Sequence, residues 1–299
     1  MDCMLCPRRC GAKRERGELG FCQSPATAHV ARAAKHFFEE PPISGTRGSG
    51  TVFFTGCSLR CIFCQNSAIR APESGRAFDA PALAELFLAL AGEGVHNINL
   101  VTPTHFADTV AAALEIARPR LGIPVVWNCG GYESPETLKR LEGLIDIYLP
   151  DFKYISPELS AQYSAAPDYA EVATAALDLM VRQVGAVSLD EKGMMRRGVI
   201  VRHLVLPGAR HDSMAVLDRI AKTVGVQDVH LSLMSQYTPD FAPADAPAPL
   251  RRRVTRFEYE SVAEHAVALG FKGYFQERSA ADAAYTPDFS EFVFPEQRS

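Results

Sequence analysis

Residues 51–66 read TVFFTGCSLRCIFCQN and join a β-branched, aromatic run to a loop that holds three cysteines. The run predicts a buried strand, and the loop directly follows its end. Cys57, Cys61 and Cys64 are separated by three and then two residues, a spacing that lets three thiolates curl round a cuboidal iron–sulfur cluster and bind three of its corners. With only three local ligands, one iron is left open for a ligand that is not part of the protein.

A zinc loop is the alternative interpretation of the same cysteines. Zinc prefers four ligands, so Cys129 or a histidine would have to complete the site. Two features argue against zinc: the loop follows the first strand of an α/β pattern, and Phe63 stands before the third cysteine. In a βα barrel the loop after a strand lies at the C-terminal face, where active sites assemble.

The rest of the chain after residue 51 alternates short apolar runs with apolar patterns at helical spacing. Near-continuous apolar strands are typical of a parallel sheet covered by helices. Six βα units in series predict an α/β fold, a partial or complete (βα)6 TIM-like barrel, because their crossovers share one hand. A doubly wound open sheet is the alternative. The expected strands are 51–55, 97–101, 124–127, 145–149, 199–206, 229–234 and a short final one at 273–275; the expected helices are 81–92, 106–117, 135–141, 169–184, 213–224 and 255–269.

The chain divides into three predicted parts. Residues 1–47 carry four cysteines and little periodicity, so they predict a small metal-binding N-terminal module. Residues 48–278 hold the barrel pattern. Residues 279–299, with prolines among acidic and aromatic side chains, are expected to form a C-terminal surface tail or cap.

The N-terminal module has its own candidate metal site, formed by Cys3, Cys6, Cys10 and Cys22. Four thiolates can close a structural zinc site or a second, fully ligated iron–sulfur cluster, and the spacing does not decide between the two. Five cations lie among these cysteines and either offset the negative charge of a thiolate site or form a solvated surface. They are Arg8, Arg9, Lys13, Arg14 and Arg16.

Composition argues against several classes of protein. The 299 residues are 47% hydrophobic and 22% charged, which is ordinary for a soluble globular chain. A net charge of −4 does not suit a protein that coats nucleic acid or an anionic membrane. No apolar run approaches the ~18 residues of a membrane span, and no secretory signal is visible, so we expect a cytoplasmic protein. Seven of the eight cysteines fall within the first 64 residues, which in a reducing compartment indicates metal or iron–sulfur ligation.

Six segments carry a resemblance to a known family: CPRRCG, HFFEEPPISGTRGSGTVFFTGCSLRCIFCQN, INLVTPTH, IDIYLPDFKY, RHLVLPG and LMSQY. Residues 48–278 resemble radical S-adenosylmethionine (radical SAM) enzymes, and nearly the whole chain is similar to pyruvate formate-lyase activating enzyme-like proteins. The resemblance implies a 4Fe–4S cluster on Cys57, Cys61 and Cys64, with SAM on the fourth iron through its amino and carboxylate groups. An electron from the cluster would cleave SAM to methionine and a 5′-deoxyadenosyl radical, which abstracts a hydrogen atom.

The same resemblance implies contacts to SAM from other strand ends. Radical SAM enzymes often carry Gly-Gly-Glu after the second strand; here Thr102-Pro-Thr104-His stands there, so the contact to the SAM amino group is left open, although threonine hydroxyls and carbonyls accept hydrogen bonds. Asp151-Phe-Lys153 resembles the Asp-Leu-Lys stretch of glycyl-radical activating enzymes, in which the lysine suits the SAM carboxylate and the aspartate its sulfonium or ribose. A structural ion pair is the alternative role for these two residues, and a place in the barrel layers is the alternative for the fifth strand's candidates. The implied cofactor-binding residues are Phe63, Thr102, Thr104, Asn128, Asp151, Lys153, Arg202 and His203.

Three hypotheses of function follow. The first is activation of a glycyl-radical enzyme by hydrogen abstraction from a backbone glycine, by analogy with the family. The second is a radical SAM enzyme that acts on a small molecule or a peptide; only residues 65–80 separate Cys64 from the next expected helix, so the ferredoxin-like insertion of larger glycyl-radical activases is absent, which neither requires nor excludes a protein substrate. The third is a non-enzymatic metal-binding adaptor, which never cleaves SAM. Either enzyme needs an electron donor of the flavodoxin or ferredoxin type.

Overall fold

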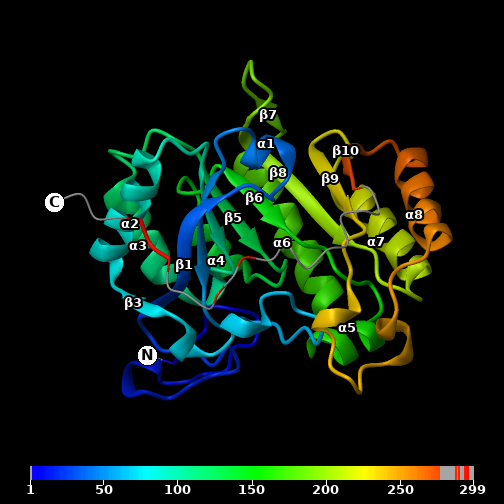
Figure 1. The fold of residues 1–299 in the computed structure, drawn as a ribbon, viewed down its shortest axis with the longest axis horizontal. Helices are drawn as coiled ribbons and strands as arrows, with labels where there is room; N and C mark the ends of the chain where they lie inside the picture. The colour runs from blue at the N-terminus through cyan, green and yellow to red at the C-terminus, as the bar shows by residue number, and fades with distance from the viewer. Residues whose placement is uncertain (1, 277–286, 288, 290–292, 296–299) are drawn as a thin grey trace.

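A computed structural model describes residues 2–276, 287, 289 and 293–295, and within them the strands form one open sheet (Figure 1). The strands are β1 (Ala28–His36), β2 (Ser49–Phe54), β3 (Arg76–Phe78), β4 (Ile98–Val101), β5 (Val125–Cys129), β6 (Ile147–Pro150), β7 (Ser188–Leu189), β8 (Met195–Leu204), β9 (Val229–Met234) and β10 (Lys272–Phe275). The helices are α1 (Pro41–Ser44), α2 (Ala80–Gly92), α3 (Ala107–Ala117), α4 (Pro135–Arg140), α5 (Pro157–Ser164), α6 (Tyr169–Val184), α7 (Arg210–Thr223) and α8 (Arg256–Ala268). Short 3-10 helices are η1 (Arg14–Arg16), η2 (Ser67–Ile69), η3 (Pro72–Ser74), η4 (Thr104–Phe106), η5 (Pro239–Phe241) and η6 (Ala248–Arg251).

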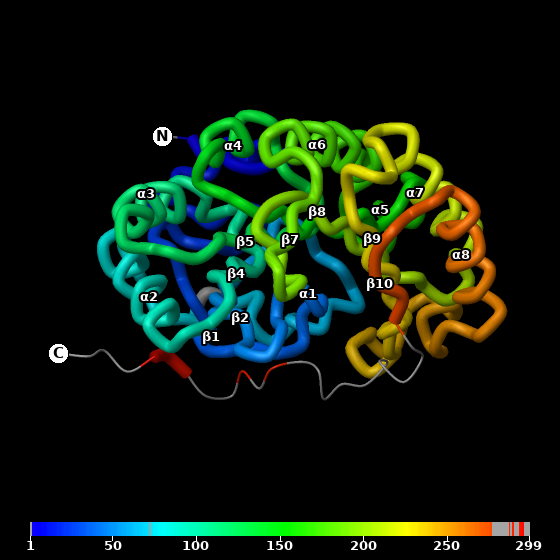
Figure 2. Tube along the Cα trace, turned by 90° about the horizontal axis from the view of Figure 1, so that it is seen from above, coloured from blue at the N-terminus to red at the C-terminus, as the bar shows by residue number. Residues whose placement is uncertain are grey.

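The parallel part of the sheet follows chain order without reversal, from β2 through β4, β5, β6, β8 and β9 to β10. A doubly wound sheet would reverse direction at a switch point, so that alternative is wrong. Among the described residues, β10 and β3 are the two edges, and the sheet does not close. In Figure 2 the outer rim is formed by helices, and the strands lie inside it; these helices are α2, α3, α4, α6, α7 and α8. The predicted partial barrel is therefore confirmed.

Every strand predicted from the apolar runs is present, and β9 covers the predicted residues 229–234. β8 begins at Met195 instead of the predicted residue 199, because its first residues pair with β7 in a hairpin that the apolar pattern does not mark. Asp79, Ser134 and Thr255 accept backbone N–H groups at the starts of α2, α4 and α8, which satisfies donors that a helix leaves unpaired.

β1 is the largest element that the sequence did not predict. It is antiparallel to β2, with Val30 opposite Phe54 and His36 opposite Ser49, and it adds β3 on its far side. Its sequence, AHVARAAKH, contains a single β-branched residue, so local propensity does not mark it as a strand and pairing with β2 decides. β1 lies before residue 47, where the predicted N-terminal module ends; that division itself stays a prediction.

The segment between β1 and β2 closes the end of the barrel opposite the cysteine loop. α1 begins at Pro41 and carries Ile43, which is completely buried. Ile43 packs with Val126, Ile147 and Ile200 from the inner faces of three parallel strands. Figure 1 places α1 at the top of the sheet, whereas the loop after β2 lies at the bottom. The interior is thus filled from one end and accessible from the other.

No helix among residues 2–276 is both long enough and apolar enough to span a membrane. The predicted tail over 279–299 lies largely outside the described residues. Of its described members, Phe289 contacts Phe53 edge-on, and the Val293 carbonyl accepts the Ala33 N–H at 2.8 Å.

Candidate functional site

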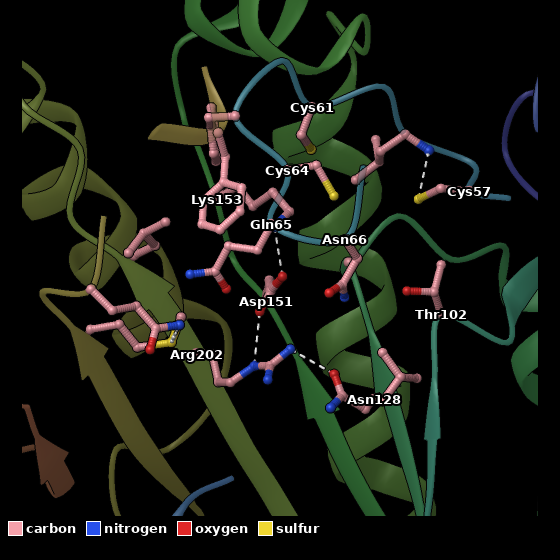
Figure 3. Close-up of a pocket in the computed structure, with 18 of the residues that line it drawn as sticks. Cys57, Cys61, Cys64, Gln65, Asn66, Thr102, Asn128, Asp151, Lys153 and Arg202 are labelled. Carbon is pink, nitrogen blue, oxygen red and sulfur yellow. Dashed lines mark hydrogen bonds and ion pairs between the residues drawn. The ribbon is translucent and has the colours of Figure 1, made fainter. Parts of the chain in front are cut away.

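A pocket of about 240 Å³ opens at the carboxyl ends of the parallel strands. The loop after β2 forms one wall, the ends of β4, β5, β6, β8 and β9 form most of the rest, and the segment between β1 and α1 and the η5 region also contribute. This is the end of a βα barrel at which loops from separate strands converge. Figure 3 shows side chains from these elements turned toward a shared space.

The three cysteines of the loop after β2 all line this pocket. In Figure 3 their sulfur atoms face a common region from one side of it. The Cys57 sulfur accepts the Leu59 N–H at 3.3 Å, and the Cys61 sulfur lies 3.0 Å from the Ser164 hydroxyl. Burial raises the pKa of Cys57, and it raises the pKa of Cys64 to about 11. Their thiolates therefore need positive charge beside them, which a bound metal cluster supplies.

Arg202 connects the charged side chains at the base of the pocket. Its Nε donates to Asp151 at 2.9 Å, its Nη2 donates to the Asn128 amide oxygen at 2.6 Å, and its Nη1 lies 3.5 Å from Glu39. Because the Asn128 oxygen accepts from Arg202, its NH₂ group is turned toward Glu39, at 3.4 Å. β5, β6, β8 and the segment before α1 are thereby joined in one network.

Asp151 and Lys153 form an ion pair at 2.6 Å, on the side of Arg202 that faces away from Asn128 (Figure 3). Burial tends to raise the pKa of Asp151, but Arg202 and Lys153 outweigh it and hold that pKa below its usual value. Burial likewise opposes the charge on Lys153, and Asp151 more than compensates, so the pKa of Lys153 is raised. Both side chains line the pocket and are charged there.

Six of the eight residues implied as cofactor contacts line the pocket: Phe63, Thr102, Asn128, Asp151, Lys153 and Arg202. Thr102 has φ 58°, a left-handed conformation that is costly for a β-branched residue. Its N–H donates to the Asn128 carbonyl at 2.8 Å, which helps to hold the chain in this turn at the end of β4.

Thr104 and His203 lie outside the pocket. The Thr104 hydroxyl donates to buried Glu133 at 2.6 Å. His203 follows Arg202 on β8, so its side chain points to the other face of the sheet, where its Nδ1 lies 2.7 Å from the Phe152 carbonyl oxygen. Burial lowers the pKa of His203 to about 4, so the side chain is neutral at pH 7.

Glu39 is a charged pocket residue that the sequence interpretation missed. It accepts the Asn99 amide at 2.9 Å in addition to its contacts with Asn128 and Arg202. Burial raises its pKa, and Arg202 opposes that rise. The paired acids in HFFEEPP, which directly precede two prolines, were the signal that the sequence offered. The pocket lining also includes a group of uncharged, mainly apolar side chains: Leu204, Leu206, Met234, Tyr237 and Phe241.

The cysteines of the N-terminal module are free thiols; Cys6 and Cys22 are buried, Cys3 is half-buried and Cys10 is exposed. Burial raises the pKa of Cys6 to about 12, and nearby Cys22 and Cys3 contribute to the rise. Within the described part of the chain, no three Cys, His, Asp or Glu side chains are grouped closely enough to hold a single metal ion. Zinc or a second cluster at this module stays a prediction.

His105 gives a pH dependence that can be tested by substitution. It is buried, and burial lowers its pKa from 6.5 to about 3, although its contact with the Thr55 carbonyl opposes the shift. Below about pH 6.5 His105 is protonated in the unfolded chain but stays neutral in the folded protein. The free energy of unfolding therefore decreases as the pH falls from about 6.5 toward 3. We expect His105→Gln to remove this contribution, which amounts to up to about 1.4 kcal/mol per pH unit.

The measurement is urea unfolding of wild type and variant at pH 7.5 and 5.5. The stability difference between the two proteins should shrink at the lower pH. The same substitution at exposed His211 controls for loss of a histidine. A stability difference that stays constant between the two pH values would contradict the assignment.

Known proteins resemble this chain in sequence and in fold. Residues 51–187 match the Radical SAM superfamily. An uncharacterized protein of Methanocaldococcus jannaschii is 27% identical over 271 residues, which are 88% of this chain and 73% of that protein. A 7-carboxy-7-deazaguanine synthase of Methanothermobacter thermautotrophicus is 26% identical over 150 residues, which are 50% of this chain and 56% of that protein. A radical SAM methyltransferase from Sphaerobacter thermophilus superposes with a TM-score of 0.53 at 15% identity, over 76% of this chain and 65% of that one.

Residues 51–187 are therefore similar to a radical SAM domain. The domain implies a 4Fe–4S cluster and SAM. The likeness to the methyltransferase shows the fold alone, and this chain spans less than two thirds of both that enzyme and the synthase. These relatives do not support the narrower pyruvate formate-lyase activating enzyme-like assignment, which stays a prediction.

Proposed function

We propose that Cys57, Cys61 and Cys64 hold the 4Fe–4S cluster and that the protein reductively cleaves SAM to start radical chemistry on a substrate in the pocket. The observation that carries this proposal is the convergence of three thiols from one loop with charged groups from the neighbouring strand ends. Sulfur is the donor that iron–sulfur clusters take, and three cysteines leave the fourth iron for SAM. When bound, the cluster and SAM supply an electron and a carbon-centred radical; the chain positions them.

The charged side chains around the pocket would orient SAM. Lys153, held by Asp151 at 2.6 Å, suits the SAM carboxylate, and Asp151 suits a positively charged or hydroxyl group. The Asn128 NH₂ and the carbonyl oxygen of Thr102 are further groups at the same strand ends. The Thr102 carbonyl stands where many radical SAM enzymes use Gly-Gly-Glu, which supports a role beside the SAM amino group. The apolar wall at Leu206 and Phe241 would exclude water from the substrate side.

We propose glycyl-radical activation as the substrate reaction, in which a hydrogen atom leaves a backbone glycine of a partner enzyme. The support is analogy: Asp151-Phe-Lys153 resembles the corresponding stretch of glycyl-radical activating enzymes. A reaction on a small molecule or a peptide is the second candidate, and the predominantly uncharged wall formed by Leu204, Met234 and Tyr237 favours a substrate with an apolar portion.

The test is anaerobic reconstitution with iron and sulfide, chemical reduction and addition of SAM. We expect methionine and 5′-deoxyadenosine to form, whereas a non-enzymatic adaptor would form neither. A glycyl-radical partner, mixed in under the same conditions, should acquire a stable glycine-centred electron paramagnetic resonance signal. If deoxyadenosine forms and no candidate partner acquires that signal, glycyl-radical activation fails and SAM cleavage stands.

A further inference from the structure

We propose that Arg8 of the N-terminal module is a positioning residue that holds the cysteine loop after β2 in the conformation that receives the cluster. The inference rests on the proposed function insofar as that loop carries the cluster ligands. From the sequence alone, Arg8 either neutralises thiolates or lies on a solvated surface. Its contacts in the structure assign it a different role.

The guanidinium of Arg8 joins the cysteine loop to the end of α5. Its Nε donates to the Ser58 carbonyl at 2.9 Å, inside the loop between the first two cysteines. Its Nη2 and Nη1 donate to the carbonyls of Ser164 and Ala165. Ala165 has φ 53°, a left-handed turn that ends α5. A guanidinium at a helix C-terminus satisfies carbonyls that the helix leaves unpaired.

The end of α5 in turn holds Cys61 directly. The Ser164 hydroxyl lies 3.0 Å from the Cys61 sulfur and 2.9 Å from the Tyr154 hydroxyl. The Ser164 carbonyl also accepts the Arg60 N–H at 3.3 Å, and the Ile62 N–H donates to the Tyr163 carbonyl at 2.9 Å. Ser164 therefore contacts both Arg8 and the proposed cluster ligand Cys61. Arg8 also binds the loop itself through Ser58, so it connects the loop to the end of α5.

A second part of the module lies against the same loop. Two guanidinium groups pack against the Phe21 ring, with Arg8 3.8 Å and Arg60 4.4 Å from its centre. Arg60 also donates to the Phe21 carbonyl at 3.0 Å. Gly56, which precedes Cys57, has φ +77°, and an added side chain there would overlap the Ser24 hydroxyl. Space for the module against the loop thus depends on glycine at this position.

The module is anchored to the barrel, so it can brace the loop. Arg14 is buried and donates to the His105 carbonyl at 2.6 Å and to the Ser24 carbonyl at 3.0 Å. The Thr137 hydroxyl donates to the Leu5 carbonyl at 2.6 Å. The bonds to His105 and Thr137 fix the module to the segments after the neighbouring strands β4 and β5. Arg8 connects the module, which these bonds hold in place, to the cysteine loop.

The test compares Arg8→Ala with Arg9→Ala. Arg9 is the matched control, because it is the next residue and carries the same charge, and among the described residues its side chain makes one exposed ion pair, with Glu136. In the cluster-free chain, we expect Arg8→Ala to speed alkylation of Cys57 and Cys61 by iodoacetamide about fivefold or more, measured by mass spectrometry, because the loop opens more often. Arg9→Ala should alkylate at the wild-type rate. Equal rates in the two variants would overturn the proposal.

The reconstituted enzyme gives a second readout. Loss of iron to a ferrous chelator should be faster in Arg8→Ala than in Arg9→Ala. The electron paramagnetic resonance spectrum of the reduced cluster should be broader in Arg8→Ala than in Arg9→Ala. Arg8→Lys, which keeps the charge and loses the fork of donors, should fall between wild type and Arg8→Ala. A lysine variant identical to alanine would leave packing loss as the cause and contradict positioning by the guanidinium.

Thermal unfolding distinguishes a local effect from a loss of fold. If Arg8→Ala does not fold, Phe21→Leu is the substitute test, because it removes the aromatic ring against Arg8 and leaves the hydrogen-bonding groups in place. Phe21→Leu should also speed alkylation of Cys57 and Cys61. An unchanged alkylation rate would overturn the proposal. Failure of the proposed function would look different: iron would persist after the loop cysteines are replaced, while the alkylation difference between Arg8→Ala and Arg9→Ala would be unaffected.

Discussion

Replacing Cys61 by alanine is expected to remove the iron bound at the cysteine loop of the reconstituted protein and to abolish SAM cleavage, whereas any iron held by the N-terminal cysteines should stay. Cys61 is the middle ligand of the proposed cluster, and its sulfur faces the pocket beside Cys64. Two thiolates hold a cuboidal cluster poorly, because a second iron then lacks a protein ligand. The expected effect is complete loss of the loop cluster, and Cys129, which lines the same pocket, is tested separately as a replacement ligand.

Cys129→Ala is the matched control for this experiment. Cys129 is a buried cysteine at the end of β5, and burial raises its pKa far above the usual value, so it is an unreactive thiol. We expect its replacement to leave the iron content of the loop site intact. SAM cleavage that persists in Cys61→Ala would overturn the assignment of the cluster to this loop. If iron also remains, the N-terminal cysteines become the candidate ligands.

Of the substitutions proposed here, Arg202→Met is expected to cause the largest decrease in the free energy of unfolding. The side chain of Arg202 is 16% exposed and pairs with Asp151, also 16% exposed, and with Glu39, 9% exposed. Removal of one member of a buried ion network leaves its partners charged without compensation, which costs about 3 kcal/mol or more. For a chain of this size we expect the melting temperature to fall by roughly 5–10 °C.

The same variant should weaken SAM binding, because Asn128 loses the donor that fixes its amide and Asp151 loses one of its two cations. Arg182→Met is the control: it breaks an exposed pair with Asp178 on α6, and such pairs contribute about 0.5 kcal/mol or less. Thermal unfolding and equilibrium binding of SAM test both points. A melting temperature of Arg202→Met equal to that of Arg182→Met would contradict a structural role for the network.

Alternation along a strand explains which site predictions the structure places at the pocket. Arg202 and His203 are neighbours on β8, and only Arg202 points into the barrel, because successive side chains of a strand face opposite sides. Thr102 and Thr104 were equivalent candidates in the sequence. The left-handed turn at Thr102 directs Thr104 to Glu133 instead of the pocket. Neither outcome was readable without the register and the turn.

The sequence by itself determined the parallel strands, the cysteine loop and the Asp151–Lys153 pair. Each of these depends on residues that are close in the chain: apolar runs mark buried strands, ligand spacing marks a loop that can surround a cluster, and two residues after a strand share its end. Only the tertiary structure decided the positions of Glu39, Arg8 and β1. They come from segments without apolar periodicity, and their partners lie far away in sequence, such as Arg202 for Glu39 and Ser164 for Arg8. Long-range contacts of this kind form because folding buries polar groups that must then find partners, and local sequence does not specify which ones.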